Sequence, residues 1–240
     1  MKNKNDTSSI SFTAHYTGYV WFHHGLSAAP FATTQGKLYF SLLKPFEKIA
    51  KSLIGSDIQT TLLQRHTLID RELDALIAKH PDLQILEIAC GLSPRGHRYT
   101  QKHSMIRYIE ADLPGMVSRK APLLDALGSL TDRHKLITCN ILDNDSSDSL
   151  PHVLHREFSP EKPLVIITEG LVNYFDLRTI SLVWRNLADL LKAYPTGLYL
   201  TDIYPEVNEH RFAGLIRIAN KSLRLISRSR FSLHFANDHL

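Results

Sequence analysis

The sequence predicts an α/β fold with a doubly wound, mostly parallel sheet. Strand-like and helix-like stretches alternate between residues 84 and 203. The stretches between the strands are long enough to hold crossover helices, which parallel strands require. A length of 240 residues with 43% hydrophobic residues is enough for one large core. We therefore expect one continuous domain.

The N-terminal part of the chain is predicted to form a helical cover over residues 10–80. Residues 1–9 are polar, and we expect them to be a disordered tail. Residues 11–54 are rich in aromatic side chains but show no clear period, so they either cover a pocket or pack on the main body. Residues 59–79 have apolar positions at helical spacing, and Pro81 follows the end of that helix.

The remaining residues, 81–240, are predicted to form the core of the domain. The expected strands are residues 84–89, 105–111, 135–139, 164–168 and 197–203. A helix with a clear apolar face lies between the last two strands, and Asp176 is placed to cap its N-terminus.

The charge pattern argues weakly for a nucleic-acid partner. The net charge is +4, and residues 211–230 contain six basic and no acidic residues. These charges follow helical spacing opposite an apolar stripe, which is typical of a solvated helix face. Base-stacking aromatic residues do not interleave with them. RNA is therefore only an alternative partner.

Other features predict a soluble, cytoplasmic protein without a membrane segment. The apolar runs are only a few residues long, and the first residues lack the apolar stretch of a secretory signal. Cys90 and Cys139 each end an expected buried strand, so we expect no disulfide framework. The 13 histidines show no metal-binding spacing, so we expect no metal site.

The first expected strand runs into a turn of small residues that contains Gly91 and Gly96. Ligands of open parallel sheets bind at the carboxyl ends of the strands, and glycines leave room for a ligand or another backbone. The GxGxxG pattern of a dinucleotide site is absent. S-adenosylmethionine has no phosphate and needs only a small-residue turn with polar partners, so it fits better.

The next strands carry polar residues near their carboxyl ends, where the same ligand could reach them. These residues are Glu110, Asp112, Asn140 and Glu169. Asp112 follows Gly91 by 21 positions, which is the usual spacing of a carboxylate that binds a ribose diol.

Three segments together resemble a known family. The segments LEIACGLSPRGHRY, IEADLPGMVSRKAPLL and VIITEGLVNYF resemble three successive signatures of the leucine carboxyl methyltransferase family, which includes polyketide O-methyltransferases. FTAHYTGYVWFHHGLS and LLQRHTLID resemble its N-terminal region, so the resemblance covers about residues 10–205. It implies a class I methyltransferase, Rossmann-like fold. It also implies an enzyme that transfers methyl from S-adenosylmethionine to a small-molecule carboxylate or hydroxyl.

The resemblance also implies a cofactor site. Its residues would be Arg65, Ala89, Gly91, Asp112, Asn140, Ile141 and Glu169. In the family pattern, Arg65 ion-pairs the cofactor carboxylate, and Asp112 binds the ribose hydroxyls. Glu169 contacts the cofactor after the fourth strand.

Two of these positions depart from the family pattern. Ala89 and Gly91 would border the methionine part of the cofactor, but Ala89 replaces the usual glycine. Asn140 and Ile141 would flank the adenine, but Asn140 replaces the usual aspartate. These departures keep open the alternative of a catalytically impaired binding protein with the same fold.

The acceptor and its activation are not settled by the sequence. A carboxylate acceptor needs no base, whereas a phenol or alcohol would be assisted by a histidine or tyrosine. Tyr174, Tyr204 and His97 are the candidates. Methylation of a protein C-terminal carboxylate or of a modified tRNA base remains an alternative.

We also expect an incomplete C-terminal edge of the sheet. Residues 230–240 resemble the start of a further unit of the family. A strand without its neighbour exposes unpaired backbone groups, so a partner chain would cover it in an oligomer.

Overall fold

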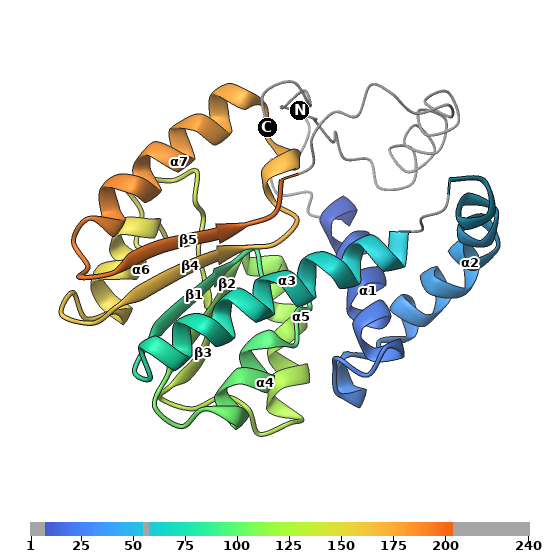
Figure 1. Cartoon of the computed structure of the whole chain (residues 1–240), viewed down its shortest axis with the longest axis horizontal. Coiled ribbons are helices and arrows are strands. Elements are labelled where there is room, and N and C mark those ends of the chain that lie inside the picture. Colours follow the sequence, from blue (N-terminus) through green and yellow to red (C-terminus); the bar gives the residue numbers. More distant parts are fainter. Residues whose placement is uncertain (1–7, 55–57, 204–240) are drawn as a thin grey trace.

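The computed structural model describes residues 8–54 and 58–203. These residues contain one five-stranded parallel sheet in the order β3-β2-β1-β4-β5 (Figure 1). The strands are β1 (Gln84–Ile88), β2 (Arg107–Asp112), β3 (His134–Thr138), β4 (Leu164–Thr168) and β5 (Gly197–Thr201). The predicted doubly wound parallel sheet is confirmed, and each strand starts and ends within two residues of its expected bounds.

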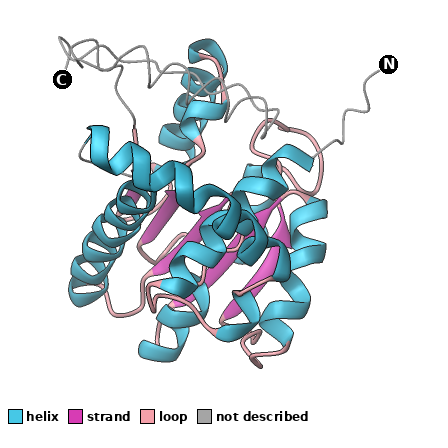
Figure 2. Cartoon of the chain, turned by 90° about the vertical axis from the view of Figure 1, so that its right-hand side faces the viewer, coloured by secondary structure: helices cyan, strands magenta, loops and turns pink. Residues whose placement is uncertain are grey.

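Helices cover both faces of the sheet (Figure 2). They are α3 (Ile58–Lys79), α4 (Arg95–Lys102), α5 (Pro114–Asp125), α6 (Leu150–Glu157) and α7 (Leu177–Leu191). One apolar cluster joins α3 and α4 to one face of the central strands, and another joins α6 and α7 to the opposite face. Strands β1 and β4 are buried at every position because both of their faces are covered.

The helix α7 forms as its sequence pattern indicates. Its buried residues are Ile180, Val183, Leu187 and Leu191. Asp176 caps the helix, since its Oδ1 accepts a hydrogen bond of 2.8 Å from the backbone N–H of Thr179.

The aromatic N-terminal segment is helical where the sequence showed no period. It forms α1 (Ser8–His23), a short 3-10 helix η1 (Ala29–Phe31) and α2 (Thr34–Ile54). Helix α1 buries Tyr16 and Val20 against Phe40 of α2, while Ala14 packs with Leu92 on another side. Apolar residues therefore lie on more than one side of α1, and no single stripe marks it.

Helix α1 lies beside the carboxyl edge of the sheet, and α2 packs on the side of α1 that faces away from the sheet (Figure 1). Ala14 and Gly18 of α1 face the turn after β1, since added Cβ atoms at Gly91 and Gly18 would meet Ala14 and Leu92, respectively. Helix α1 begins at Ser8, inside the segment expected to be a tail.

Four expectations concern residues outside the described part of the chain. They are the tail over residues 1–7, the basic segment 211–230, Tyr204 and the edge of the sheet beyond β5. Across residues 8–54 and 58–203, no helix combines the length and hydropathy needed to cross a membrane.

Candidate functional site

The candidate site lies at the carboxyl ends of the strands. There β1 and β4 are neighbours, and the strand order runs outward from them to β2 and β3 on one side and to β5 on the other. Such a switch point is where open α/β sheets bind ligands. We call this edge the rim, and define it as residues 89–91, 112–113, 139–141, 169–170 and 202.

The turn after β1 has two residues in the left-handed region. Gly91 has φ +48° and Ala89 has φ +54°. This conformation is ordinary for glycine but costs about 1–2 kcal/mol for a residue with a Cβ atom. The structure thus explains why the family pattern has glycine where this chain has Ala89.

Replacing Ala89 by glycine is expected to raise the free energy of unfolding by about 0.5–1 kcal/mol, because the strain relieved exceeds the added chain entropy. Urea unfolding measures this. Ala126 ends α5 in a right-handed conformation with φ −61°, so Ala126→Gly is the matched control and should lower stability. If Ala89→Gly lowers the free energy of unfolding as much as the control does, the backbone of Ala89 is not strained.

Asp112 lies directly beside this turn. Its Oδ2 accepts a 2.8 Å hydrogen bond from the backbone N–H of Gly91, and its Oδ1 accepts one of 2.7 Å from that of Leu113. Burial raises the pKa of Asp112, although these two backbone hydrogen bonds act in the opposite direction. A carboxylate oxygen can accept more than one hydrogen bond, so Asp112 can also accept from a diol.

Arg65 and Glu169 form an ion pair at the end of β4. The Nε of Arg65 donates to Glu169 Oε1 at 2.9 Å. A Cβ atom at Gly170 would lie 2.8 Å from Nη1 of Arg65, so this glycine lets the guanidinium lie against the backbone. The backbone N–H of Gly170 donates to Oδ1 of Asp202, which follows β5, at 2.5 Å. The structure therefore brings together two residues that the sequence assigned to the cofactor separately.

Asn140 and Ile141 continue the rim after β3. The backbone N–H of Cys139 donates to the carbonyl oxygen of Asp112 at 3.0 Å, which joins this turn to the end of β2. The Oδ1 of Asn140 accepts a hydrogen bond of 3.1 Å from the backbone N–H of Leu142. Both Asn140 and Ile141 are half-buried.

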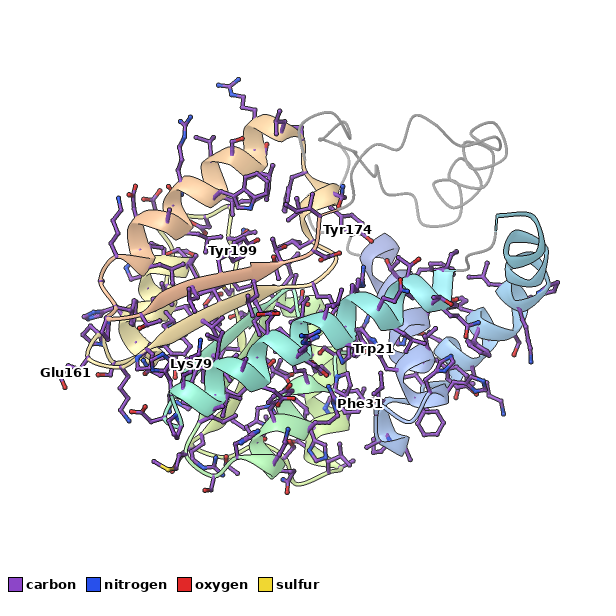
Figure 3. The ribbon with its side chains drawn as sticks, in the orientation of Figure 1. Trp21, Phe31, Lys79, Glu161, Tyr174 and Tyr199 are labelled. Carbon is purple, nitrogen blue, oxygen red and sulfur yellow. The ribbon has the colours of Figure 1, made fainter. Side chains whose placement is uncertain are left out.

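The candidate bases occupy different places. Tyr174 lies in the 3-10 helix η2 (Val172–Tyr174), close to α1 (Figure 3), and its hydroxyl lies 3.4 Å from Oγ1 of Thr13. His97 lies in α4, and its Nδ1 is 2.9 Å from Oγ of Ser129, which also contacts His134 at the first residue of β3. His97 is therefore at the amino end of β3, away from the rim.

Gly96 and Glu110 do not belong to the ligand site, so their interpretation from the sequence was wrong. Glu110 has no exposed surface, pairs with Lys120 Nζ at 2.5 Å, and lies 3.2 Å from Nε2 of His134. A Cβ atom at Gly96 would collide with this carboxylate. Gly96 thus makes room for a buried side chain of the protein itself.

A second set of residues at the site was missed in the sequence. Arg95 is completely buried and donates to Asp70, Glu87 and Glu169 at 2.6 Å each. Nδ1 of His66 is 2.9 Å from Glu169 Oε2. The repeated arginines of the SPRGHRY signature were the available signal, but a sequence does not show which charges are buried.

The comparisons with known proteins decide the family. The family model for leucine carboxyl methyltransferase matches residues 24–188. The chain belongs to this family. The prediction from the three signatures is confirmed.

One curated relative is the tetracenomycin polyketide synthesis O-methyltransferase TcmP of Streptomyces glaucescens. It is 24% identical to this chain over 134 residues, which are 56% of this chain and 44% of the relative. The chain therefore spans less than half of the length of that relative.

Solved structures share the fold. A DUF574 family protein from Streptomyces avermitilis gives a TM-score of 0.62 at 14% identity, covering 95% of this chain and 80% of its own. A protein from Thermobifida fusca with a proposed methyltransferase activity gives 0.58 at 13% identity, covering 91% and 75%. They support the class I methyltransferase fold expected for the family.

The described residues offer no site for a metal ion or an accessible thiol. Residues 8–54 and 58–203 contain no group of His, Cys, Asp or Glu side chains that could hold a metal. Cys90 and Cys139 are both buried and unpaired with each other. Burial raises the pKa of both thiols, that of Cys139 to about 12.

Proposed function

We propose that the protein is an S-adenosylmethionine-dependent O-methyltransferase that acts on a carboxylate or hydroxyl of a small molecule of the polyketide type. The observation that carries this proposal is the hydrogen bond between Asp112 and Gly91 at the switch point of the sheet. Family membership and the similarity to a polyketide O-methyltransferase support it.

The residues at the rim, and Arg65 beside it, suit this cofactor. Asp112 supplies an acceptor for the ribose diol, and Arg65 supplies a cation for the carboxylate of the methionine part. Asn140 and Ile141 would flank the adenine, as the family pattern implies. A dinucleotide is a poorer fit because the turn lacks a GxGxxG loop for its pyrophosphate.

The chemistry requires orientation more than a protein nucleophile. The cofactor would supply a methyl group activated by a sulfonium. The chain's own residues would hold the acceptor oxygen in line with that methyl group and exclude water, an effect that contributes several powers of ten in rate. Tyr174 of η2 and Thr13 of α1 contact each other shortly after the end of β4, and we assign them to the acceptor side.

Incubation of the full chain with methyl-labelled S-adenosylmethionine tests the proposal. The acceptor panel holds small carboxylic acids, phenols, a peptide with a free C-terminal carboxylate, and tRNA. We expect label in a small molecule, and mild alkali distinguishes a methyl ester, which it cleaves, from a methyl ether. Label confined to the peptide or to tRNA would contradict the proposed acceptor class. For tRNA, a steep loss of affinity with salt would support that alternative.

A further inference from the structure

Arg95 occupies a central position below the rim. It is the first residue of α4, directly after the β1 turn, and its side chain has no exposed surface. Its Nε donates to Asp70 of α3, Nη1 to Glu87 of β1, and Nη2 to Glu169 after β4. One guanidinium therefore joins α3 to β1 and to the end of β4, the two strands of the switch point.

Further cations pair with the carboxylates that surround Arg95. We call Arg65, His66, Asp70, Glu87, Arg95, Arg98 and Glu169 the Arg95 cluster. Arg65 pairs with Glu169, and Arg98 pairs with Asp70. Burial raises the pKa of Glu169, but Arg95, His66 and Arg65 outweigh that effect and hold it well below its usual range. Glu169 is thus ionised whenever the protein is folded near neutral pH.

The two oxygens of Glu169 have different partners. Oε2 accepts from Arg95 at 2.6 Å, and Oε1 accepts from Arg65 at 2.9 Å. Arg95 is fully buried, whereas the side chain of Arg65 is 16% exposed. The carboxylate therefore links a fixed interior cation to a cation at the rim, beside Gly170.

We propose that Arg95 is a positioning residue for the carboxylate end of the ligand. It fixes Glu169, and Glu169 fixes the guanidinium of Arg65 where the ligand carboxylate binds. This inference rests on the proposed function, since it takes the ligand to be an adenosyl amino acid. It predicts that Arg95 affects the amino-acid part of the ligand and not the adenosine part.

The test compares two nucleosides by calorimetry with the full chain. S-adenosylhomocysteine carries the amino-acid carboxylate, and methylthioadenosine has the same adenosine without it. Arg95→Lys keeps the charge, but a compact ammonium group lacks the planar fork of donors with which the guanidinium reaches three separate carboxylates. We expect this variant to bind S-adenosylhomocysteine about tenfold more weakly, while its affinity for methylthioadenosine changes less than about twofold.

Two further variants sharpen the test. Arg107→Lys is the matched control, because Arg107 also donates to several acceptors but lies at the first residue of β2, at the opposite end of the strand from the rim, and it should leave the ratio of the two affinities unchanged. In an Arg65→Met background, Arg95→Lys should cause no further loss of S-adenosylhomocysteine affinity, since both act through one contact.

The outcomes separate this inference from the proposed function. A parallel loss of both ligands in Arg95→Lys, or no loss of either, would overturn the positioning role while the wild type still binds both. A folded wild type that binds neither nucleoside would overturn the proposed function and this inference with it. If Arg95→Lys does not fold, Asp70→Asn is the deciding variant, because it removes the negative charge of the acceptor that bonds the Arg95 Nε. We then expect a loss of about threefold confined to S-adenosylhomocysteine, and equal losses would refute the role.

Discussion

Replacing Asp112 by asparagine is expected to weaken binding of S-adenosylhomocysteine by at least about 100-fold. Hydrogen bonds to a charged group contribute about 1.5–3 kcal/mol each, and the ribose would lose two of them. Burial raises the pKa of Asp112, so the fold itself gains little from its charge. The free energy of unfolding should therefore fall by no more than about 1–3 kcal/mol, the cost of one unpaired backbone N–H.

The matched control is Asp74→Asn in α3. Asp74 pairs with Lys102 at 2.8 Å, and both side chains are about half exposed (47% and 59%). An exposed ion pair contributes little to stability, so this variant should fold as the wild type does. Neither Asp74 nor Lys102 belongs to the rim, so calorimetry should show unchanged affinity. An Asp112→Asn protein that binds S-adenosylhomocysteine as tightly as the wild type would remove Asp112 from the site.

Replacing Lys120 by methionine is expected to lower the free energy of unfolding by about 3–5 kcal/mol. Lys120 and Glu110 form an ion pair with no exposed surface, and removing one partner leaves a buried charge without its counter-ion. Burial lowers the pKa of Lys120, but Glu110 and its other acidic neighbours outweigh this and raise it above the usual range. Thermal unfolding should show a midpoint lowered by about 10 °C.

The double variant Lys120→Met with Glu110→Gln tests the cause of that loss. It removes both charges, and glutamine can still bond to His134, whose Nε2 lies 3.2 Å from the carboxylate. We expect it to recover most of the lost stability. If the double variant is no more stable than Lys120→Met alone, the loss comes from packing rather than from an unpaired charge.

The sheet was predictable because buried parallel strands leave short, continuous apolar runs. β4 was predicted at its observed bounds, and the ends of the others differ by at most two residues. The helix α7 was marked by its apolar face and by Asp176. By contrast, α1 packs on more than one side, so its aromatic residues follow no single period.

The site was predictable only in part. The resemblance to the family indicated Gly91, Asp112, Arg65 and Glu169, and the structure places the first two in hydrogen-bond contact and the last two in an ion pair. The role of Gly96 was misjudged, because the space beside this residue of α4 is taken by the side chain of Glu110 in β2.

The central role of Arg95 was also invisible in the sequence. Its partners are 25, 8 and 74 positions away along the chain, and only the fold brings them to one guanidinium.

A crystal structure of the full chain with bound S-adenosylhomocysteine is the decisive test of the proposed cofactor site. We expect the ribose hydroxyls within hydrogen-bond distance of the Asp112 carboxylate, the adenine beside Asn140 and Ile141, and the amino-acid carboxylate on Arg65. A ligand bound elsewhere on the protein, with Asp112 still bonded only to Gly91 and Leu113, would contradict it.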